Sequence, residues 1–249
     1  MTVPNRSASR RAAKPYSRMV TIGDATLYQG DAYEILHTLG WFDVLVMDPP
    51  YVIDMSGGGK FRADRKHFSE IEEEELDRGF DYSIINALMC GAVVVFCHNN
   101  QVPELSTFLN GSFERFTICA WHKSNPMPVA NKSYQPDTEF YIHAWNRDFA
   151  VAGELADKKR HITTAVGKSD FDHPTVKPDA VMAKIITNVG GRSICDPFMG
   201  TGSTGVAAIM AGKRFVGIEK NPKHFATAVE RLTAAHAEAE RLAAEQEAA

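Results

Sequence analysis

Four consecutive residues, Asp48-Pro49-Pro50-Tyr51, combine a carboxylate, a rigid corner and an aromatic ring. The apolar run before them, residues 43–47, predicts a buried strand. The four residues then lie at its carboxyl end, which is where open α/β sheets bind ligands. Two successive prolines cannot donate hydrogen bonds and keep the backbone extended. They therefore present the carboxylate of Asp48 and the ring of Tyr51 at fixed angles.

This set of groups suits attack by an aromatic amine on an electrophile. Such an amine is a poor nucleophile because its lone pair is delocalised into the ring. Hydrogen bonds from the amine to the Asp48 carboxylate and the Pro49 carbonyl favour a more tetrahedral nitrogen, while Tyr51 can stack on the ring. A base in duplex DNA reaches such a pocket only by flipping out of the helix. The alternative roles are a turn cap for Asp48 and core packing for Tyr51.

A glycine-rich turn forms the second candidate site. Residues 196–205, DPFMGTGSTG, follow a short apolar strand and precede a helix, and Glu219 ends the next predicted strand. The glycines let the backbone approach a ligand closely, and the acid can accept hydrogen bonds from ribose hydroxyls. The spacing also fits the dinucleotide fingerprint, so an NAD-dependent oxidoreductase is an alternative of another class. Too few residues follow Gly200 to complete such a sheet, so upstream strands must complete it in a permuted order.

Apolar runs alternate with helical patterns along most of the chain. This alternation predicts an α/β fold with a mostly parallel central sheet and helices on both faces. The predicted strands cover residues 43–47, 92–97, 116–121, 140–145, 193–195 and 215–218. The predicted helices cover residues 72–89, 102–109, 179–189, 203–211 and a long segment from 222, whose last two turns we expect to fray.

The chain of 249 residues is expected to form one large domain over residues 19–235. Residues 1–18 have basic side chains and no acidic ones, which predicts a flexible basic arm that can touch nucleic acid. The basic residues of this arm are Arg6, Arg10, Arg11, Lys14 and Arg18. Two irregular stretches, near residues 52–70 and 124–172, interrupt the alternation, and loops of this length are functional or disordered. Residues 236–249 form an Ala- and Glu-rich tail, helical or frayed.

The formal net charge of −4 is unusual for a DNA-binding protein, because phosphate contacts require Lys and Arg. A local basic cluster nevertheless follows Tyr51 and has aromatic residues interleaved. It consists of Lys60, Arg62, Arg65 and Lys66. We expect this loop to contact phosphates or to enter a groove beside a flipped base. The alternative is a solvated loop.

The sequence also argues against several other features. The four cysteines lie in apolar segments without C-x-x-C spacing, which argues against a metal site and against disulfides and indicates buried thiols. There is no apolar run of about 18 residues and no signal region, so we expect a cytoplasmic protein without a membrane span. No cysteine follows a proline, which disfavours C5-cytosine methylation.

The chain resembles the amino-methylating DNA methyltransferases, the N6-adenine and N4-cytosine enzymes, in their permuted β-type order. The resemblance rests on several motifs in one order: Gly30-Asp31, Asp48 to Tyr51, WHKSNPMP at 121–128, HPTVKP at 173–178 and DPFMGTG at 196–202. It implies a Rossmann-like fold that depends on S-adenosylmethionine, with S-adenosylhomocysteine as product and without a metal. It also implies double-stranded DNA as partner, and it allows for a homodimer.

The resemblance further assigns roles to individual residues. It implies Asp48, Pro49, Pro50 and Tyr51 as the catalytic set, and it places Asn125 and Pro126 beside the target base. The implied cofactor site consists of Asp31, Asp48, Thr175, Lys177, Asp196, Phe198, Gly200, Thr201, Gly202 and Glu219. Within it, Asp31 would reach the adenine of the cofactor, and Thr175 and Lys177 would lie near its methionine carboxylate.

In similar proteins the Asp-Pro-Pro-Tyr form more often accompanies adenine, whereas a Ser in first place more often accompanies cytosine. N6-adenine is therefore the expected target, with N4-cytosine as the alternative. Methylation of RNA or protein and a catalytically silent DNA-binding module stay open. So does the choice between restriction-modification, phage self-protection and regulation.

Overall fold

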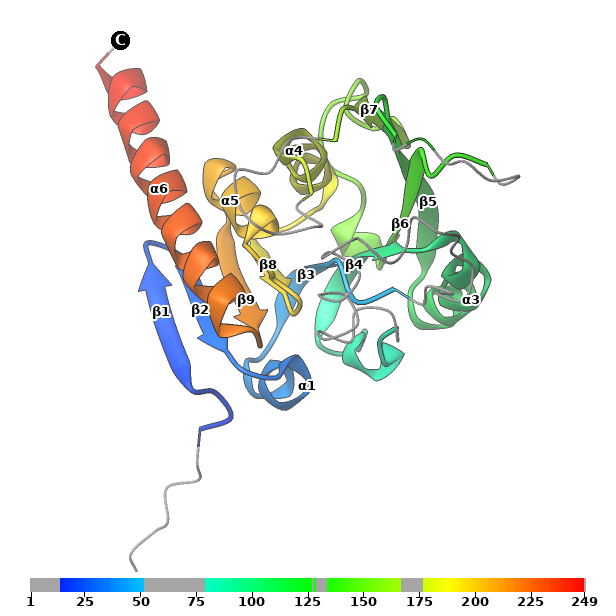
Figure 1. Cartoon of the computed structure of the whole chain (residues 1–249), viewed down its shortest axis with the longest axis horizontal. Coiled ribbons are helices and arrows are strands. Elements are labelled where there is room, and N and C mark those ends of the chain that lie inside the picture. The colour runs from blue at the N-terminus through cyan, green and yellow to red at the C-terminus, as the bar shows by residue number, and fades with distance from the viewer. Residues whose placement is uncertain (1–13, 52–78, 127, 129–133, 167–176, 249) are drawn as a thin grey trace, which may run out of the picture.

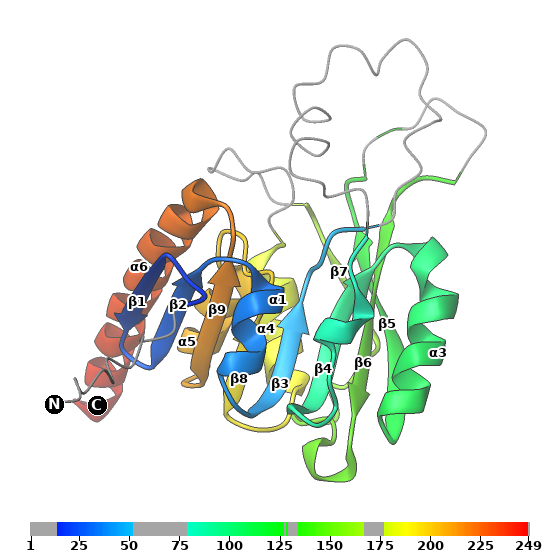
Figure 2. The same cartoon turned by 90° about the horizontal axis from the view of Figure 1, so that it is seen from below.

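The computed structural model describes residues 14–51, 79–126, 128, 134–166 and 177–248. At its centre lies one nine-stranded sheet with the order β1-β2-β9-β8-β3-β4-β6-β5-β7 (Figures 1 and 2). The strands are β1 (Arg18–Ile22), β2 (Ala25–Gln29), β3 (Phe42–Met47), β4 (Cys90–Cys97), β5 (Arg115–Lys123), β6 (Thr138–Trp145), β7 (His161–Thr164), β8 (Ser193–Asp196) and β9 (Arg214–Glu219).

Most neighbouring strands run parallel, as predicted. The run β2-β9-β8-β3-β4 is parallel throughout, and β5 is parallel to β7, whereas β1–β2, β4–β6 and β6–β5 are antiparallel. Every residue of β4 is buried, which is typical of a strand covered on both faces. The carboxyl ends of the five parallel strands from β2 to β4 therefore meet at one edge of the sheet.

Helices cover both faces of the sheet, also as predicted (Figure 2). The helices are α1 (Ala32–Ile35), α3 (Val102–Ser112), α4 (Asp179–Asn188), α5 (Ser203–Met210) and α6 (Pro222–Glu247), with short 3-10 turns η1 (Leu36–Thr38), η2 (Tyr82–Ile84), η3 (Asn99–Gln101) and η4 (Arg147–Phe149). Helices α4, α5 and α6 pack into one apolar core, and α1 and α3 pack into a second core on the opposite face. The sheet is thus the middle layer of three.

All six predicted strands lie within observed ones, but β1, β2 and β7 were not predicted. Strands β1 and β2 form a hairpin across the two residues Gly23-Asp24. The predicted end of the basic arm at residue 18 is wrong. The Ser17 amide donates to the Gln29 carbonyl at 2.9 Å, and the ring centroids of Tyr16 and Tyr28 lie 5.0 Å apart. Residues 14–18 therefore belong to the folded domain, and residues 1–13 lie outside the described residues. Strand β7 lies within the stretch expected to be irregular.

The predicted helix over residues 72–89 is wrong in its described part, residues 79–89. Gly79 has a φ of +77°, and the Asp81 carboxylate accepts from the Ser83 amide at 2.8 Å and caps η2. The ring of Phe80 packs on Tyr82 and Phe198. These aromatic contacts and the glycine outweigh the helical spacing of the apolar residues.

Helix α6 is helical to Glu247, against the expected fraying of its last two turns, and extends past the sheet (Figure 1). Its distal part carries ion pairs from Arg241 to Glu238 at 2.7 Å and to Glu245 at 2.5 Å. Pairs three and four residues apart stabilise an exposed helix. Its proximal part is held instead by buried apolar residues, including Phe225 and Leu232.

Candidate active site

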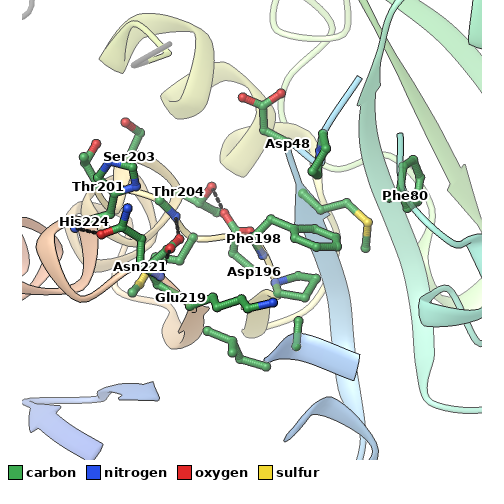
Figure 3. A pocket seen from close by; sticks show the side chains of 18 of the residues that line it. Asp48, Phe80, Asp196, Phe198, Thr201, Ser203, Thr204, Glu219, Asn221 and His224 are labelled. Atoms are coloured by element: carbon green, nitrogen blue, oxygen red, sulfur yellow. Dashed lines mark hydrogen bonds between the residues drawn. The ribbon is translucent and has the colours of Figure 1, made fainter. Parts of the chain in front are cut away.

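A cavity of about 530 Å³ opens at the carboxyl ends of β2, β9, β8 and β3. Its size lies within the range of about 300–1,000 Å³ that is usual for small-molecule sites. Its walls come from the turns that follow these four strands, together with Phe80, Phe96 and Lys177. The sheet therefore brings both motifs of the sequence, the carboxylate corner and the glycine turn, to one cavity (Figure 3).

The glycine turn after β8 is held closed by Glu219 at the end of β9. One oxygen of its carboxylate accepts from the Gly200 amide at 2.8 Å, and the other accepts from the Asn221 amide at 2.6 Å. Gly200 and Gly202 have φ values of +53° and +88°, in the left-handed region that favours glycine. A Cβ at Gly202 would lie 2.6 Å from a methyl group of Leu232 on α6. Both glycines are required by the backbone conformation.

Asp196, at the end of β8, is buried inside this turn. Its carboxylate accepts from the Thr204 hydroxyl at 2.5 Å and from the Phe198 amide at 3.0 Å (Figure 3). Burial raises the pKa of Asp196 to about 7, which outweighs those hydrogen bonds, and the nearby Asp48 and Glu219 carboxylates raise the pKa further. Asp196 therefore titrates near neutral pH.

Because of this raised pKa, ionisation of Asp196 makes the stability of the protein depend on pH. The usual carboxyl pKa is 3.8, so between about pH 4 and pH 7 the native state keeps a proton that the unfolded chain releases. The free energy of unfolding then falls as the pH rises through this window, by up to about 1.4 kcal/mol per pH unit.

An Asp196→Asn variant does not titrate, while its amide can still accept from the Phe198 amide and donate to the Thr204 oxygen. We expect its stability to rise relative to the wild type by a few kcal/mol between pH 4.5 and pH 7.5. Urea unfolding at a series of pH values measures this difference. Two parallel stability curves would contradict the raised pKa.

Another part of the cavity wall is formed by aromatic rings and by Asp31. The ring of Phe198 lies 6.2 Å from the rings of both Tyr33 and Phe80. The Asp31 carboxylate caps α1 by accepting from the Tyr33 amide at 2.9 Å and pairs with Lys220 at 3.3 Å. This part of the wall offers an apolar surface for a flat ring, and the Asp31 carboxylate beside it offers oxygen acceptors.

Asp48 stands at the junction between the cavity and the carboxyl end of β3. Its Oδ1 accepts from the Tyr51 hydroxyl at 2.7 Å, and its Oδ2 accepts from the Lys177 Nζ at 2.5 Å. The same Nζ lies 3.3 Å from the Tyr51 hydroxyl and 3.2 Å from Glu139 Oε2. Glu139 also pairs with Lys123 at 2.6 Å. These residues form one chain of alternating charges.

Burial disfavours the charged forms of Lys177 and Glu139, and the opposite charges around them outweigh this effect. The carboxylates of Asp48 and Glu139 hold the pKa of Lys177 above its usual value in spite of burial. Likewise Lys177 and Lys123 hold the pKa of Glu139 below its usual value. Burial and the Asp48 charge raise the pKa of Tyr51 well above its usual value. At neutral pH, Asp48 therefore faces an ammonium group and a neutral hydroxyl.

The structure brings most of the predicted site residues together. The predicted residues that line the cavity are Asp31, Asp48, Pro50, Lys177, Asp196, Phe198, Gly200, Thr201 and Glu219. Gly202 faces Leu232 and Ala228 of α6, the Tyr51 hydroxyl donates to Asp48, and Pro49 is buried directly after Asp48 in the chain. Thr175, Lys60, Arg62, Arg65 and Lys66 lie outside the described residues.

Asn125 and Pro126 do not line this cavity. Instead the Asn125 side chain bridges to the main chain of Val166, accepting from its amide at 2.6 Å and donating to its carbonyl at 3.2 Å. Asn125 thus ties the segment after β5 to the segment after β7. A contact with a target base stays a prediction for both residues.

Sequence reasoning missed several cavity residues: Tyr33, Phe80, Lys220, Asn221 and His224. One signal was available, because Asn221 precedes Pro222 in the order typical of a helix N-cap followed by proline. The Asn221 side chain does cap α6 by accepting from the Lys223 amide at 2.8 Å. Glu139 was missed as well and had no local signal beyond an acid at the start of an apolar strand.

The described residues contain no group of three or more His, Cys, Asp or Glu side chains that could hold a metal ion. The four cysteines are free thiols, three of them buried. None of the helices in the part of the chain described here is long and apolar enough to cross a membrane.

A doubly wound sheet with a cavity at its strand carboxyl ends, a glycine turn and an acid after the next strand defines a class of proteins that bind nucleotide-like ligands. Comparison with known families narrows this class. The family model described as DNA methylase matches residues 42–230, and the chain belongs to this family of N6 and N4 amino-methyltransferases. The chain is thus a DNA amino-methyltransferase, and the NAD-dependent alternative is dropped.

Two relatives are type II methyltransferases. The chain is 28% identical over 222 residues to M2.DpnII of Streptococcus pneumoniae, covering 77% of this chain and 82% of that one. It is 25% identical over 240 residues to M2.LlaDCHI of Lactococcus lactis subsp. cremoris, covering 84% and 89%.

Solved structures share the fold. M1.HpyAVI, in a complex with SAM, superposes with a TM-score of 0.61 at 26% identity, covering 84% of this chain and 100% of that one. The cytosine-N4-specific PvuII DNA methyltransferase has a TM-score of 0.62 at 13% identity, covering 87% and 89%, which shows the fold alone. The Rossmann-like methyltransferase fold expected from the sequence is confirmed. The permuted order of the motifs stays a prediction.

Proposed function

We propose that this chain transfers a methyl group from S-adenosylmethionine to the N6 amino group of adenine in double-stranded DNA. The observation that carries the proposal is the Asp48 carboxylate, which lines a cavity of about 530 Å³ and is followed directly by Pro49 in the chain. The choice of adenine rests on Asp rather than Ser in the first place of the motif. N4-cytosine is the second candidate, because the same carboxylate and carbonyl serve either amine.

The cavity residues fit S-adenosylmethionine. Phe198 with Tyr33 and Phe80 offers an apolar surface for the adenine ring, and Asp31 and Glu219 offer acceptors for the adenine and the ribose hydroxyls. When bound, this cofactor supplies a methyl group activated by a positively charged sulfur. The SAM complex of M1.HpyAVI supports the assignment. Thr175 and Lys177 are proposed near the methionine carboxylate.

The proposed chemistry of this chain's own residues begins with the amine. A flipped base would donate one N–H to Asp48 and the other to the Pro49 carbonyl, which directs the nitrogen lone pair toward the cavity. A carboxylate has about four lone-pair positions, so Asp48 can accept from the amine in addition to Tyr51. Tyr51 keeps its proton at neutral pH and stacks on the base. The proton released after transfer passes to water or to Asp48.

DNA binding is proposed to use the basic loop with Lys60, Arg62, Arg65 and Lys66, together with Asn125 and Pro126. The loop follows Tyr51 directly in the chain, so it would stand beside the flipped base. Its basic side chains would contact DNA phosphates, although the chain as a whole has a net negative charge. The type II names of the relatives support a place in restriction-modification. A homodimer stays a proposal.

The testing experiment is mass spectrometry of nucleosides from plasmid DNA grown in a methylation-deficient host that expresses this chain. The same host with an empty vector is the control. We expect N6-methyladenine in the expressing strain alone. N4-methylcytosine would keep the mechanism and change the base. Neither product, from folded protein that binds S-adenosylmethionine, would overturn the DNA assignment and favour RNA or protein as substrate.

A further inference from the structure

The ammonium group of Lys177 lies between two carboxylates that come from different strands. Asp48 follows β3, and Glu139 is the second residue of β6. The Lys177 Nζ is 2.5 Å from Asp48 Oδ2 and 3.2 Å from Glu139 Oε2. The Lys177 side chain is 7% exposed, so the ammonium cannot rely on water in place of these partners. Its position is set by the two carboxylates.

The two carboxylates are not equally satisfied. Both oxygens of Asp48 accept hydrogen bonds, from Tyr51 and from Lys177. Glu139 Oε1 pairs with Lys123, but its buried Oε2 accepts no hydrogen bond from the described residues. Glu139 Oε2 thus already lies within ion-pair distance, 3.2 Å, of an ammonium whose hydrogen bonds go to Asp48 and Tyr51.

In the proposed reaction the neutral target amine joins Tyr51 and Lys177 as a donor to the Asp48 carboxylate. The positively charged donor on Oδ2 withdraws electron density from this carboxylate and so weakens its hydrogen bond to the amine. If Lys177 left Asp48 with no other partner, a buried charge would be uncompensated, at a large cost in free energy. The ammonium therefore needs another acceptor within reach, and among the described residues Glu139 supplies it, whether or not the methionine carboxylate of the cofactor also lies nearby.

We propose that Glu139 is a positioning residue that takes the ammonium group of Lys177 when the target amine hydrogen-bonds to Asp48. This proposal rests on the proposed role of Asp48. The exchange requires only a small movement of the Lys177 side chain, because Nζ already lies near Glu139 Oε2. It leaves the total charge of the cluster unchanged, since no proton is transferred. Glu139 itself does not touch the base.

The variant Glu139→Gln keeps the shape of the side chain and removes the charge that would receive Lys177. Tritium transfer from labelled S-adenosylmethionine to plasmid DNA of a methylation-deficient host, with enzyme in excess, measures the single-turnover rate. We expect the rate to fall about 10- to 100-fold, the usual effect of losing a hydrogen bond to a charged group. Cofactor binding, measured by calorimetry, should change far less. Glu139→Asp should restore part of the rate.

A double variant separates this role from a merely structural one. In a Lys177→Gln background no ammonium has to move, so adding Glu139→Gln should cause no further loss of rate. Glu114→Gln is the matched control, because Glu114 is an exposed carboxylate just before β5, and it should keep the wild-type rate. A wild-type rate in Glu139→Gln, or rate losses that multiply in the double variant, would overturn the proposal.

The same assay keeps this proposal apart from the proposed function. If Asp48→Asn is inactive while Glu139→Gln is fully active, only the role of Glu139 fails. If Asp48→Asn retains the wild-type rate, the role of Asp48 fails and the exchange fails with it.

Discussion

Replacing Asp48 with asparagine is expected to lower the rate of methyl transfer strongly and to spare cofactor binding. Asparagine keeps the shape of the side chain and an acceptor for the Tyr51 hydroxyl, but its amide lacks the negative charge that an amine donor and Lys177 both require. We expect the single-turnover rate to fall by about 10²- to 10⁴-fold, the range found for removal of a charge-stabilising or proton-accepting group. Calorimetric titration with S-adenosylmethionine should give a dissociation constant close to that of the wild type.

Asp48→Ala should be equally inactive but less informative. It leaves the buried ammonium of Lys177 without its closest partner, and breaking a buried ion pair destabilises the fold. A urea unfolding curve distinguishes this loss of stability from loss of chemistry. Turnover at the wild-type rate in folded Asp48→Asn would remove Asp48 from the mechanism.

The central sheet and both motif positions could be predicted from the sequence because they depend on local pattern. Strands β3 and β4 are covered on both faces and so appear as continuous apolar runs, and the chain turns at Asp48 directly after one of them. The glycine turn could also be predicted from the sequence, since Gly200 and Gly202 adopt positive φ values that other residues avoid. For these elements the local pattern and the tertiary structure agree.

The sequence does contain a signal for the β1–β2 hairpin. Two short β-branched or apolar runs flank Gly23-Asp24, and a two-residue loop that begins with glycine is a hairpin indicator. The basic composition of residues 1–18 instead favoured an arm that extended too far. Strand β7 is a four-residue edge strand and has too few residues for a periodic pattern.

The contacts between distant residues could not be predicted from spacing. Lys177 is separated from Asp48 by 129 positions, and their pairing depends on the tertiary contact that brings Lys177, two residues before α4, to the carboxyl end of β3. The family resemblance implies only that Lys177 lies near the methionine carboxylate of the cofactor, and the structure adds ion pairs with the carboxylates of Asp48 and Glu139. Phe80 was likewise hidden, because its aromatic contacts with Phe198 and Tyr82 replace the helix that its neighbours predict.

Gly202→Asp is the second variant with a large expected effect, on cofactor binding. The residue has a φ of +88°, and any Cβ there would lie 2.6 Å from a Leu232 methyl group and 3.2 Å from the Ala228 Cβ. The turn must therefore shift away from α6 and toward the cavity, which displaces the cavity-lining Gly200 and Thr201. We expect the dissociation constant for S-adenosylmethionine to rise at least about 100-fold, equivalent to about 2.7 kcal/mol.

Gly212→Ala separates backbone strain from the effect on the cavity. Gly212 also has a positive φ, +63°, but a Cβ there meets no atom within 4 Å, and the residue lies after α5, away from the cavity-lining turns. This control should lose about 1 kcal/mol of stability through left-handed strain and keep the wild-type affinity. Gly202→Asp should lose both stability and affinity. Unaltered affinity in folded Gly202→Asp would show that the glycine turn does not bind the cofactor, whatever the cavity beside it holds.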